Sequence, residues 1–221
     1  MQFSHHQLLT VNPNSKSYHQ TAFLDEKLAK VQSIAGLQSI LSRYHSNILK
    51  LGVHVSYFNS KDLKEFNEIV SANGWDKTLV PTPILSPAKL TAYEEAVSTL
   101  FKTKADFENA FFVVEIPKRR TELKLLFERH GAIFVPKKDR LIYSPQARLQ
   151  DSAAENRIAH RNLVQSLKAP DLKVVFVFGV YLSQCVKNAV ISVKNLLHEI
   201  KREDVKIAIS HLVAKDVKEF V

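Results

Sequence analysis

Hydrophobic residues recur at steps of three and four in several parts of this chain, which is the spacing of one face of an α-helix. The longest such pattern covers residues 24–48 and predicts a long N-terminal helix, with Gly36 as a weak point inside it. Ser86-Pro87 is a typical helix start, and Gly131 is a typical helix end. The pattern predicts further helices over residues 60–73, from 87 onward, and over 118–130, 152–168 and 181–202.

Short hydrophobic runs between these helices predict β-strands. Two neighbouring runs, 132–136 and 140–144, flank Lys137-Lys138-Asp139 and predict a central basic β-hairpin. Strands that alternate with helices indicate an α/β fold with a partly parallel sheet, which the hairpin would make mixed. An α+β class is the alternative. The other predicted strands cover residues 53–58, 110–116, 173–178 and 206–212.

The chain is long enough for one large domain, and its 221 residues include 45% hydrophobic and 24% charged residues. We interpret residues 1–20 as a polar N-terminal arm and residues 21–221 as a single α/β domain. Pro117 and Ala169-Pro170 are the places where that domain could divide. The arm lacks the pattern of a secretory signal, and no apolar run could span a membrane. We therefore expect no membrane partner and a cytoplasmic location, or a nuclear one in a eukaryote.

Glycine, cysteine and histidine limit the kinds of site that the chain could build. The five glycines are isolated from one another, so neither a P-loop nor a GxGxxG fingerprint can be written. The nine histidines are scattered, and with a single cysteine no cysteine-based zinc site is available. We expect no cofactor and no metal. Cys185 and Ser183 follow Gly179 at a strand-to-helix transition, but the apolar surroundings favour a buried structural Cys185.

The positive charge is concentrated in one quarter of the chain. The formal net charge is +9, and residues 117–168 alone contribute +7, whereas residues 1–116 are neutral. Such asymmetry is typical of a site for a polyanion, although a charged run is often only a solvated face. The hairpin tip and one arc of helix 152–168 would present most of this charge. The residues predicted to contact nucleic acid are Arg119, Arg120, Lys137, Lys138, Arg140, Tyr143, Arg157, Arg161 and Lys168.

These features favour a non-enzymatic protein that binds DNA or RNA, alone or as a subunit of a larger assembly, and leave two alternatives open. The first is a structural subunit whose amphipathic helices, 24–48 and 181–202, bind a protein partner or a second copy. Its basic residues would then face an acidic partner. The second is a metal-dependent nuclease, with Glu115 at a strand end, Lys118 three residues later and Asp106 as a second carboxylate.

Overall fold

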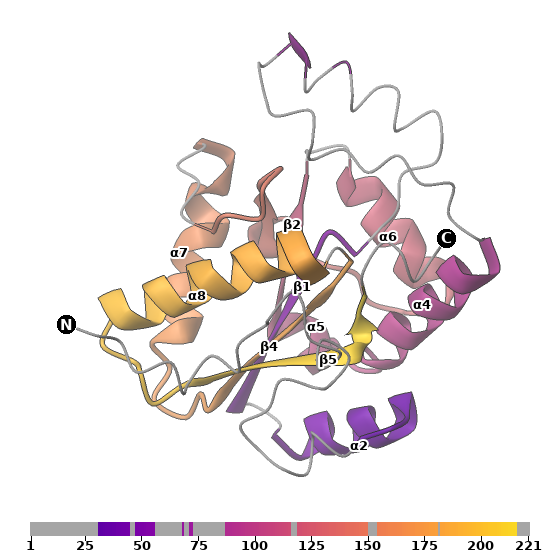
Figure 1. The fold of residues 1–221 in the computed structure, drawn as a ribbon, viewed down its shortest axis with the longest axis horizontal. Coiled ribbons are helices and arrows are strands. Elements are labelled where there is room, and N and C mark those ends of the chain that lie inside the picture. Colours follow the sequence, from indigo (N-terminus) through magenta and orange to yellow (C-terminus); the bar gives the residue numbers. More distant parts are fainter. Residues whose placement is uncertain are drawn as a thin grey trace.

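The computed structural model describes most of the chain between residues 31 and 215. The described residues are 31–44, 47–55, 68, 71–72, 87–115, 119–149, 154–180 and 182–215. The predicted N-terminal arm and nearly all of the predicted helix 60–73 lie outside these ranges. Figure 1 shows the arrangement of the elements that the ranges contain.

Five parallel strands form one sheet at the centre of the described residues. Their order across the sheet is β3-β2-β1-β4-β5, so β1 lies in the middle and β3 and β5 lie at the edges. This order reverses direction between β1 and β4, as in open, doubly wound α/β sheets, which bind ligands beyond the carboxyl ends of such a pair. The strands are β1 (Ile48–Val53), β2 (Ala110–Val114), β3 (Leu141–Tyr143), β4 (Val174–Gly179) and β5 (Lys206–Ala214).

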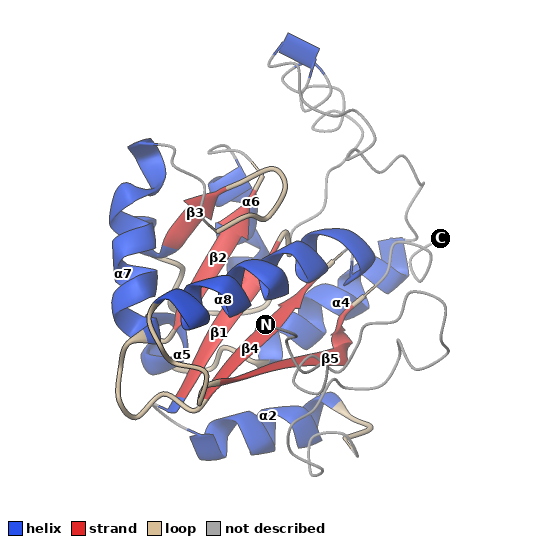
Figure 2. Cartoon of the chain, turned by 60° about the vertical axis from the view of Figure 1, so that its left-hand side comes forward, coloured by secondary structure: helices blue, strands red, loops and turns tan. Residues whose placement is uncertain are grey.

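Helices cover both faces of this sheet, as Figure 2 shows. Helices α4 (Pro87–Thr99) and α6 (Arg119–Arg129) lie on one face, whereas α7 (Arg157–Leu167) and α8 (Lys187–Glu199) lie on the other. Right-handed crossovers require this division, because the chain moves in one direction from β1 to β3 and in the opposite direction from β3 to β5. Helix α2 (Ile34–Tyr44) precedes β1, the short α5 (Lys104–Glu108) precedes β2, and a π-helical turn, 182–186, precedes α8.

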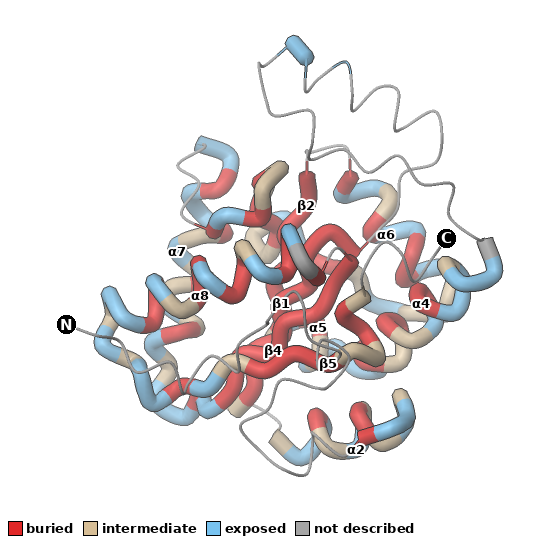
Figure 3. The backbone as a smooth tube through the Cα atoms, viewed as in Figure 1, coloured by how far each residue is buried: buried red, intermediate tan, exposed pale blue. Residues whose placement is uncertain are grey.

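Strands buried on both faces form the core, which Figure 3 shows as a continuous buried layer. Every residue of β1, β2 and β4 is buried, as expected for parallel strands between two helical layers. Phe101, Phe112, Phe127 and Phe178 pack together with ring centroids 5.1–6.3 Å apart. The hydrophobic face of α8 also packs on this core through Ala189, Val190, Val193, Leu196 and Leu197.

The prediction of an α/β fold is confirmed, but three local expectations are wrong. The sheet of the described residues is parallel throughout and not mixed, and it contains no central hairpin. Residues 132–136 form no strand, whereas β3 pairs in parallel with β2. Pro136 has no N–H to donate to a ladder, and Ile133 is 89% exposed. The described part of the N-terminal helix ends at Tyr44, because Ile48 begins β1.

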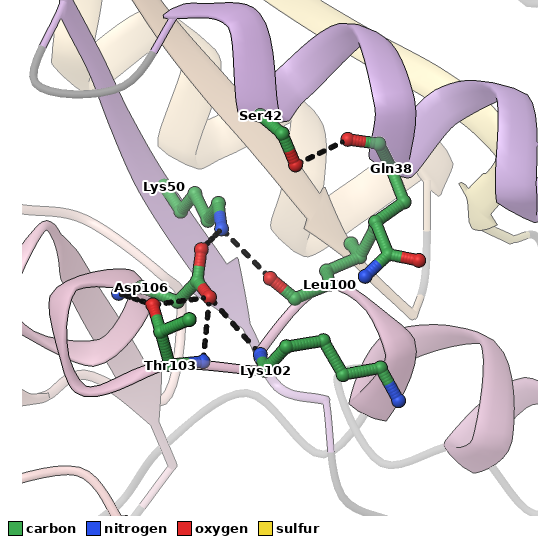
Figure 4. A network of polar contacts seen from close by, with 7 residues as sticks. All are labelled: Gln38, Ser42, Lys50, Leu100, Lys102, Thr103 and Asp106. Carbon is green, nitrogen blue, oxygen red and sulfur yellow. Dashed lines mark hydrogen bonds and ion pairs between the residues drawn. The ribbon is translucent and has the colours of Figure 1, made fainter.

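A buried ion pair joins the middle of the sheet to the connection that precedes β2, as Figure 4 shows. Lys50 in β1 is 5% exposed, and its ammonium donates to Asp106 Oδ1 at 2.5 Å and to the Leu100 carbonyl at 2.7 Å. The other oxygen of Asp106 accepts the backbone N–H groups of Lys102 and Thr103 and the Thr103 hydroxyl. Burial alone would raise the pKa of Asp106, but the bonds from Lys50 and Thr103 lower it below its usual value.

Two further polar contacts hold elements of the outer layers together. Glu94 of α4 accepts two hydrogen bonds of 3.0 Å from the Arg129 guanidinium of α6. The Arg202 guanidinium donates to the carbonyls of Leu167, Ala169 and Leu172, and so fastens the loop after α8 to the connection between α7 and β4. None of the helices in the described ranges is both long and apolar enough to cross a lipid bilayer.

Candidate functional site

Buried polar side chains gather where the carboxyl ends of the strands meet. His54 follows β1, Glu115 follows β2 and Ser144 follows β3, and all three residues are less than 5% exposed. Cys185, in the π-helical turn after β4, is 6% exposed, and its sulfur is close enough to the His54 imidazole to raise the pKa of that ring. Because the strands are parallel, residues far apart in the sequence meet at one edge of the sheet. We call His54, Glu115, Arg119 and Cys185 the carboxyl-end cluster.

The backbone and the ring of His54 are both fixed by their neighbours. Its φ of 49° is in the left-handed region, which a non-glycine residue adopts at a cost in conformational energy. The ring nitrogen Nε2 lies 2.9 Å from the Ser144 carbonyl oxygen. Since a carbonyl can only accept a hydrogen bond, Nε2 carries a proton. The other nitrogen, Nδ1, lies 3.8 Å from Glu115 Oε1 and is the one left to exchange a proton.

Glu115 lies just before α6, between the imidazole of His54 and the guanidinium of Arg119. Its second oxygen, Oε2, is 3.8 Å from Nε of Arg119, the first residue of that helix. Arg119 is 2% exposed, so the ion pair is taken out of water. Both contacts of the carboxylate, to His54 and to Arg119, are longer than a hydrogen bond. Oε2 accepts no hydrogen bond from the described part of the chain.

The surroundings of His54 favour its charged form. Burial lowers the pKa of the imidazole, but the neighbouring Cys185 sulfur and the Glu115 carboxylate raise it more. The hydrogen bonds to Cys185 and to the Ser144 carbonyl add to this effect, and the pKa of His54 is raised to about 9. His54 is therefore an imidazolium at neutral pH, with a carboxylate and a sulfur beside it.

Gly179 allows the end of β4 to approach the end of β1 next to this cluster. Its φ is +153°, and a Cβ at this position would lie 2.0 Å from the Val53 carbonyl oxygen. Only glycine fits such a contact. The approach brings the segment that carries Cys185 close to His54, which immediately follows Val53. The side chain of Ser183, the neighbouring candidate from the sequence, is not among those that the structure describes.

Nothing in the geometry of the described residues resembles a metal site. They contain no group of three or more histidine, cysteine, aspartate or glutamate side chains arranged to hold a metal ion. Asp106, which we considered as a second carboxylate for Glu115, is bonded to Lys50. Lys118, the third residue of the nuclease hypothesis, lies outside the described residues.

Most of the residues predicted to bind nucleic acid lie on or beside α7. Residues 138–140 form a 3₁₀ turn against α7, and Asn162 of α7 donates to the carbonyl and the carboxylate of Asp139 at 3.2 Å. This contact places Lys137 and Lys138 next to the helix whose basic residues the sequence predicted to bind nucleic acid. We call the exposed members of this group the basic surface, and they are Lys137, Lys138, Arg157, Arg161 and Lys168.

The other four predicted residues are placed differently. Arg140 is half-buried, with its guanidinium 4.6 Å from the centre of the Phe111 ring and 3.4 Å from Ser166 Oγ. Tyr143 is half-buried, and its backbone N–H and carbonyl are both bonded to the Asn156 amide. Arg120 is exposed on α6, which covers the opposite face of the sheet from α7. Arg119 belongs to the carboxyl-end cluster, so we leave it out of the basic surface.

Sequence reasoning missed the carboxyl-end cluster as a unit. It considered Glu115 and Cys185 separately and counted His54 only as one of nine scattered histidines. The prediction that Cys185 is buried is confirmed. The available signal was that His54, Glu115 and Cys185 each follow a strand closely, which in a parallel sheet places them at one edge.

No family model matches this sequence, and neither a curated protein nor a solved structure shows significant similarity to it. We therefore infer the function from the sequence and the geometry of this chain alone.

Proposed function

We propose that this protein binds nucleic acid through the basic surface on α7 and the adjoining 3₁₀ turn. The observation that carries the proposal is that five exposed cationic side chains lie on two adjacent elements or on the residues that cap them. Residues 137–140 and 154–168 contain six lysines and arginines but only two acidic residues. Such a surface attracts phosphates and releases their counterions, so binding would depend steeply on salt and little on sequence.

The packing of α7 supports this proposal. Ala159, Leu163 and Leu167 are buried against the sheet, while Arg157 and Arg161 lie on the solvent side. A helix with one buried face and one cationic face fixes the backbone from which its charged side chains project, which lowers the entropy lost on binding. Helix α7 contains no acidic residue that would neutralise these charges internally. Helix α6 differs, because its Lys124 pairs with Glu128.

The test is a binding titration with fluorescently labelled single-stranded DNA, double-stranded DNA and RNA over a series of salt concentrations. The variant Lys137→Glu/Lys138→Glu/Arg161→Glu should weaken binding at least about tenfold and reduce the slope of log K against log salt by about 2 to 3. The matched control is Lys102→Glu/Lys187→Glu/Lys206→Glu, which changes net charge equally at exposed residues elsewhere. Equal losses in both variants would mean that net charge, and not this surface, drives binding. No binding by the wild type would reject the proposal.

A further inference from the structure

Large apolar side chains project into water beside the cations of the basic surface. Ile133 is 89% exposed and Phe134 is 37% exposed, and both come just before the lysine pair. Ile158 is 63% exposed and lies between Arg157 and Arg161 on α7. Resting on the nucleic-acid binding proposed above, we propose that this surface prefers single strands, whose unpaired bases pack against Phe134 and Ile133 while their phosphates contact the neighbouring cations.

The segment that carries Ile133 and Phe134 is held at both ends. At its start, the N–H of Ala132 donates to the carbonyl of Phe127 at 3.0 Å, which ties the segment to the end of α6. At its other end, Pro136 is buried and leads directly into the 3₁₀ turn that packs on α7. The two exposed side chains therefore project from an anchored backbone, so little ordering is needed when bases pack on them.

The apolar and cationic side chains are close enough for one strand to contact both. Phe134 is three residues from Lys137, so their Cα atoms are at most about 11 Å apart. Ile158 and Arg161 are also three residues apart, which makes them neighbours on the surface of α7. Proteins that bind single strands combine cations that follow the phosphates with rings on which bases stack. Since every base has a face that can stack, this contact also tolerates any sequence.

A duplex and an anionic membrane fit these side chains less well. The bases of a duplex are already stacked on one another, so an apolar side chain can reach their faces only after a base step is unstacked, at a cost in free energy. Binding in the plane of a membrane needs a helix with a broad exposed apolar face. The apolar face of α7, which includes Leu163 and Leu167, is instead buried.

The first test compares a labelled oligonucleotide of mixed sequence, alone and annealed to its complement, by fluorescence anisotropy at matched salt. We expect the wild type to bind the single strand at least about tenfold more tightly than the duplex, the effect of one or two stacked bases. Equal affinity for the two would overturn the preference for single strands and leave the proposed nucleic-acid binding in place. Tighter binding to vesicles of phosphatidylserine and phosphatidylcholine than to the single strand would also overturn it.

The second test removes the ring without changing the charge. Phe134→Leu should weaken single-strand binding about fivefold or more and leave the slope of log K against log salt unchanged, because no phosphate contact is lost. Phe134→Trp, which keeps a ring, should bind as tightly as the wild type. The matched control is Ile191→Ala, which removes a 42% exposed apolar side chain on α8, outside the basic surface. Equal losses in Phe134→Leu and Ile191→Ala would contradict a specific role for the ring.

An abasic strand of the same length separates the bases from the phosphates. The wild type should bind it more weakly than the intact strand and no more tightly than Phe134→Leu does, because neither protein then has a base to stack. Weaker binding of the abasic strand by a folded Phe134→Leu, with folding checked by circular dichroism, would mean that the ring does not act on bases and would overturn the proposal.

The charge variant Lys137→Glu/Lys138→Glu/Arg161→Glu distinguishes the failure of this proposal from that of the proposed function. Binding that is lost in this variant but unchanged in Phe134→Leu would reject base stacking and keep the basic surface. No binding of any strand by the wild type would reject both.

Discussion

Lys50 and His54 lie four residues apart on and just after the central strand, and both bury a basic side chain next to a carboxylate. Their surroundings differ. The ammonium of Lys50 has two hydrogen bonds of 2.5–2.7 Å, and its partner Asp106 accepts three more on its other oxygen. The carboxylate beside His54 has two ionic contacts of 3.8 Å. A buried pair with short hydrogen bonds fixes a structure, whereas one with longer contacts leaves its buried charge less fully compensated.

The largest effect is expected where the backbone leaves no space near the carboxyl-end cluster. Gly179→Ala would place a Cβ 2.0 Å from the Val53 carbonyl and force β4 away from β1. We expect a loss of about 5 kcal/mol in the free energy of unfolding, a large part of the stability of a domain. Urea denaturation monitored by circular dichroism measures it.

Gly131→Ala is the matched control for that substitution. Gly131 also has a positive φ, +78°, but no atom lies within 4 Å of the added Cβ. Gly131→Ala should lower the free energy of unfolding by only about 1 kcal/mol, because only the left-handed backbone disfavours it. If the two variants lose the same stability, steric contact between β4 and β1 is not what Gly179 avoids.

The Lys50–Asp106 pair should prove structural. Lys50→Met removes the buried ammonium and leaves Asp106 without its partner, which should cost about 4 kcal/mol in unfolding free energy. Urea denaturation of Lys50→Met beside the wild type measures this cost, and a variant as stable as the wild type would show that the pair does not hold the structure together.

The raised pKa of His54 predicts how stability depends on pH. A group whose pKa is higher in the folded state stabilises fully below its unfolded pKa, here near 6.5, and loses that contribution as pH rises through about 9. The difference in unfolding free energy between wild type and His54→Asn should therefore shrink by an amount on the order of 3 kcal/mol over this range. Denaturation at a series of pH values measures it, and a difference that grows with pH would contradict the assignment.

Exposed ion pairs give the smallest expected effect. Lys104 and Glu108 are 3.5 Å apart on α5 with both side chains exposed to water. Lys104→Ala should change the free energy of unfolding by only about 0.3 kcal/mol. A cost above about 1 kcal/mol would show that solvent screens these surface charges less than the comparison with the buried pairs assumes.

The sequence predicted those elements whose signals are local. Continuous β-branched and aromatic runs identified β2 and β4, and the helical spacing with Gly131 beyond its end identified α6. It failed at β1, because Ile48 also continues the helical period of the preceding segment. It failed at β3, because two neighbouring hydrophobic runs do not reveal whether they pair with each other or with a distant strand.

The basic surface and the carboxyl-end cluster also differ in how far the sequence alone predicts them. The basic surface could be predicted in outline, because its charges are close together in the sequence and α7 has a regular period. The burial of Arg119 could not be predicted, because it depends on how Glu115, just after a strand, meets the first turn of the next helix. His54 and Cys185 are separated by more than half the chain, and only the parallel order of β1 and β4 brings them together.

The left-handed backbone at His54 also provides a criterion for recognising distant relatives of this chain. A relative that keeps the fold but has lost the buried contact between His54 and Glu115 should carry asparagine or glycine at this position, because those residues accept the same backbone. A relative that retains histidine there keeps the imidazole beside the carboxylate despite the cost of that backbone.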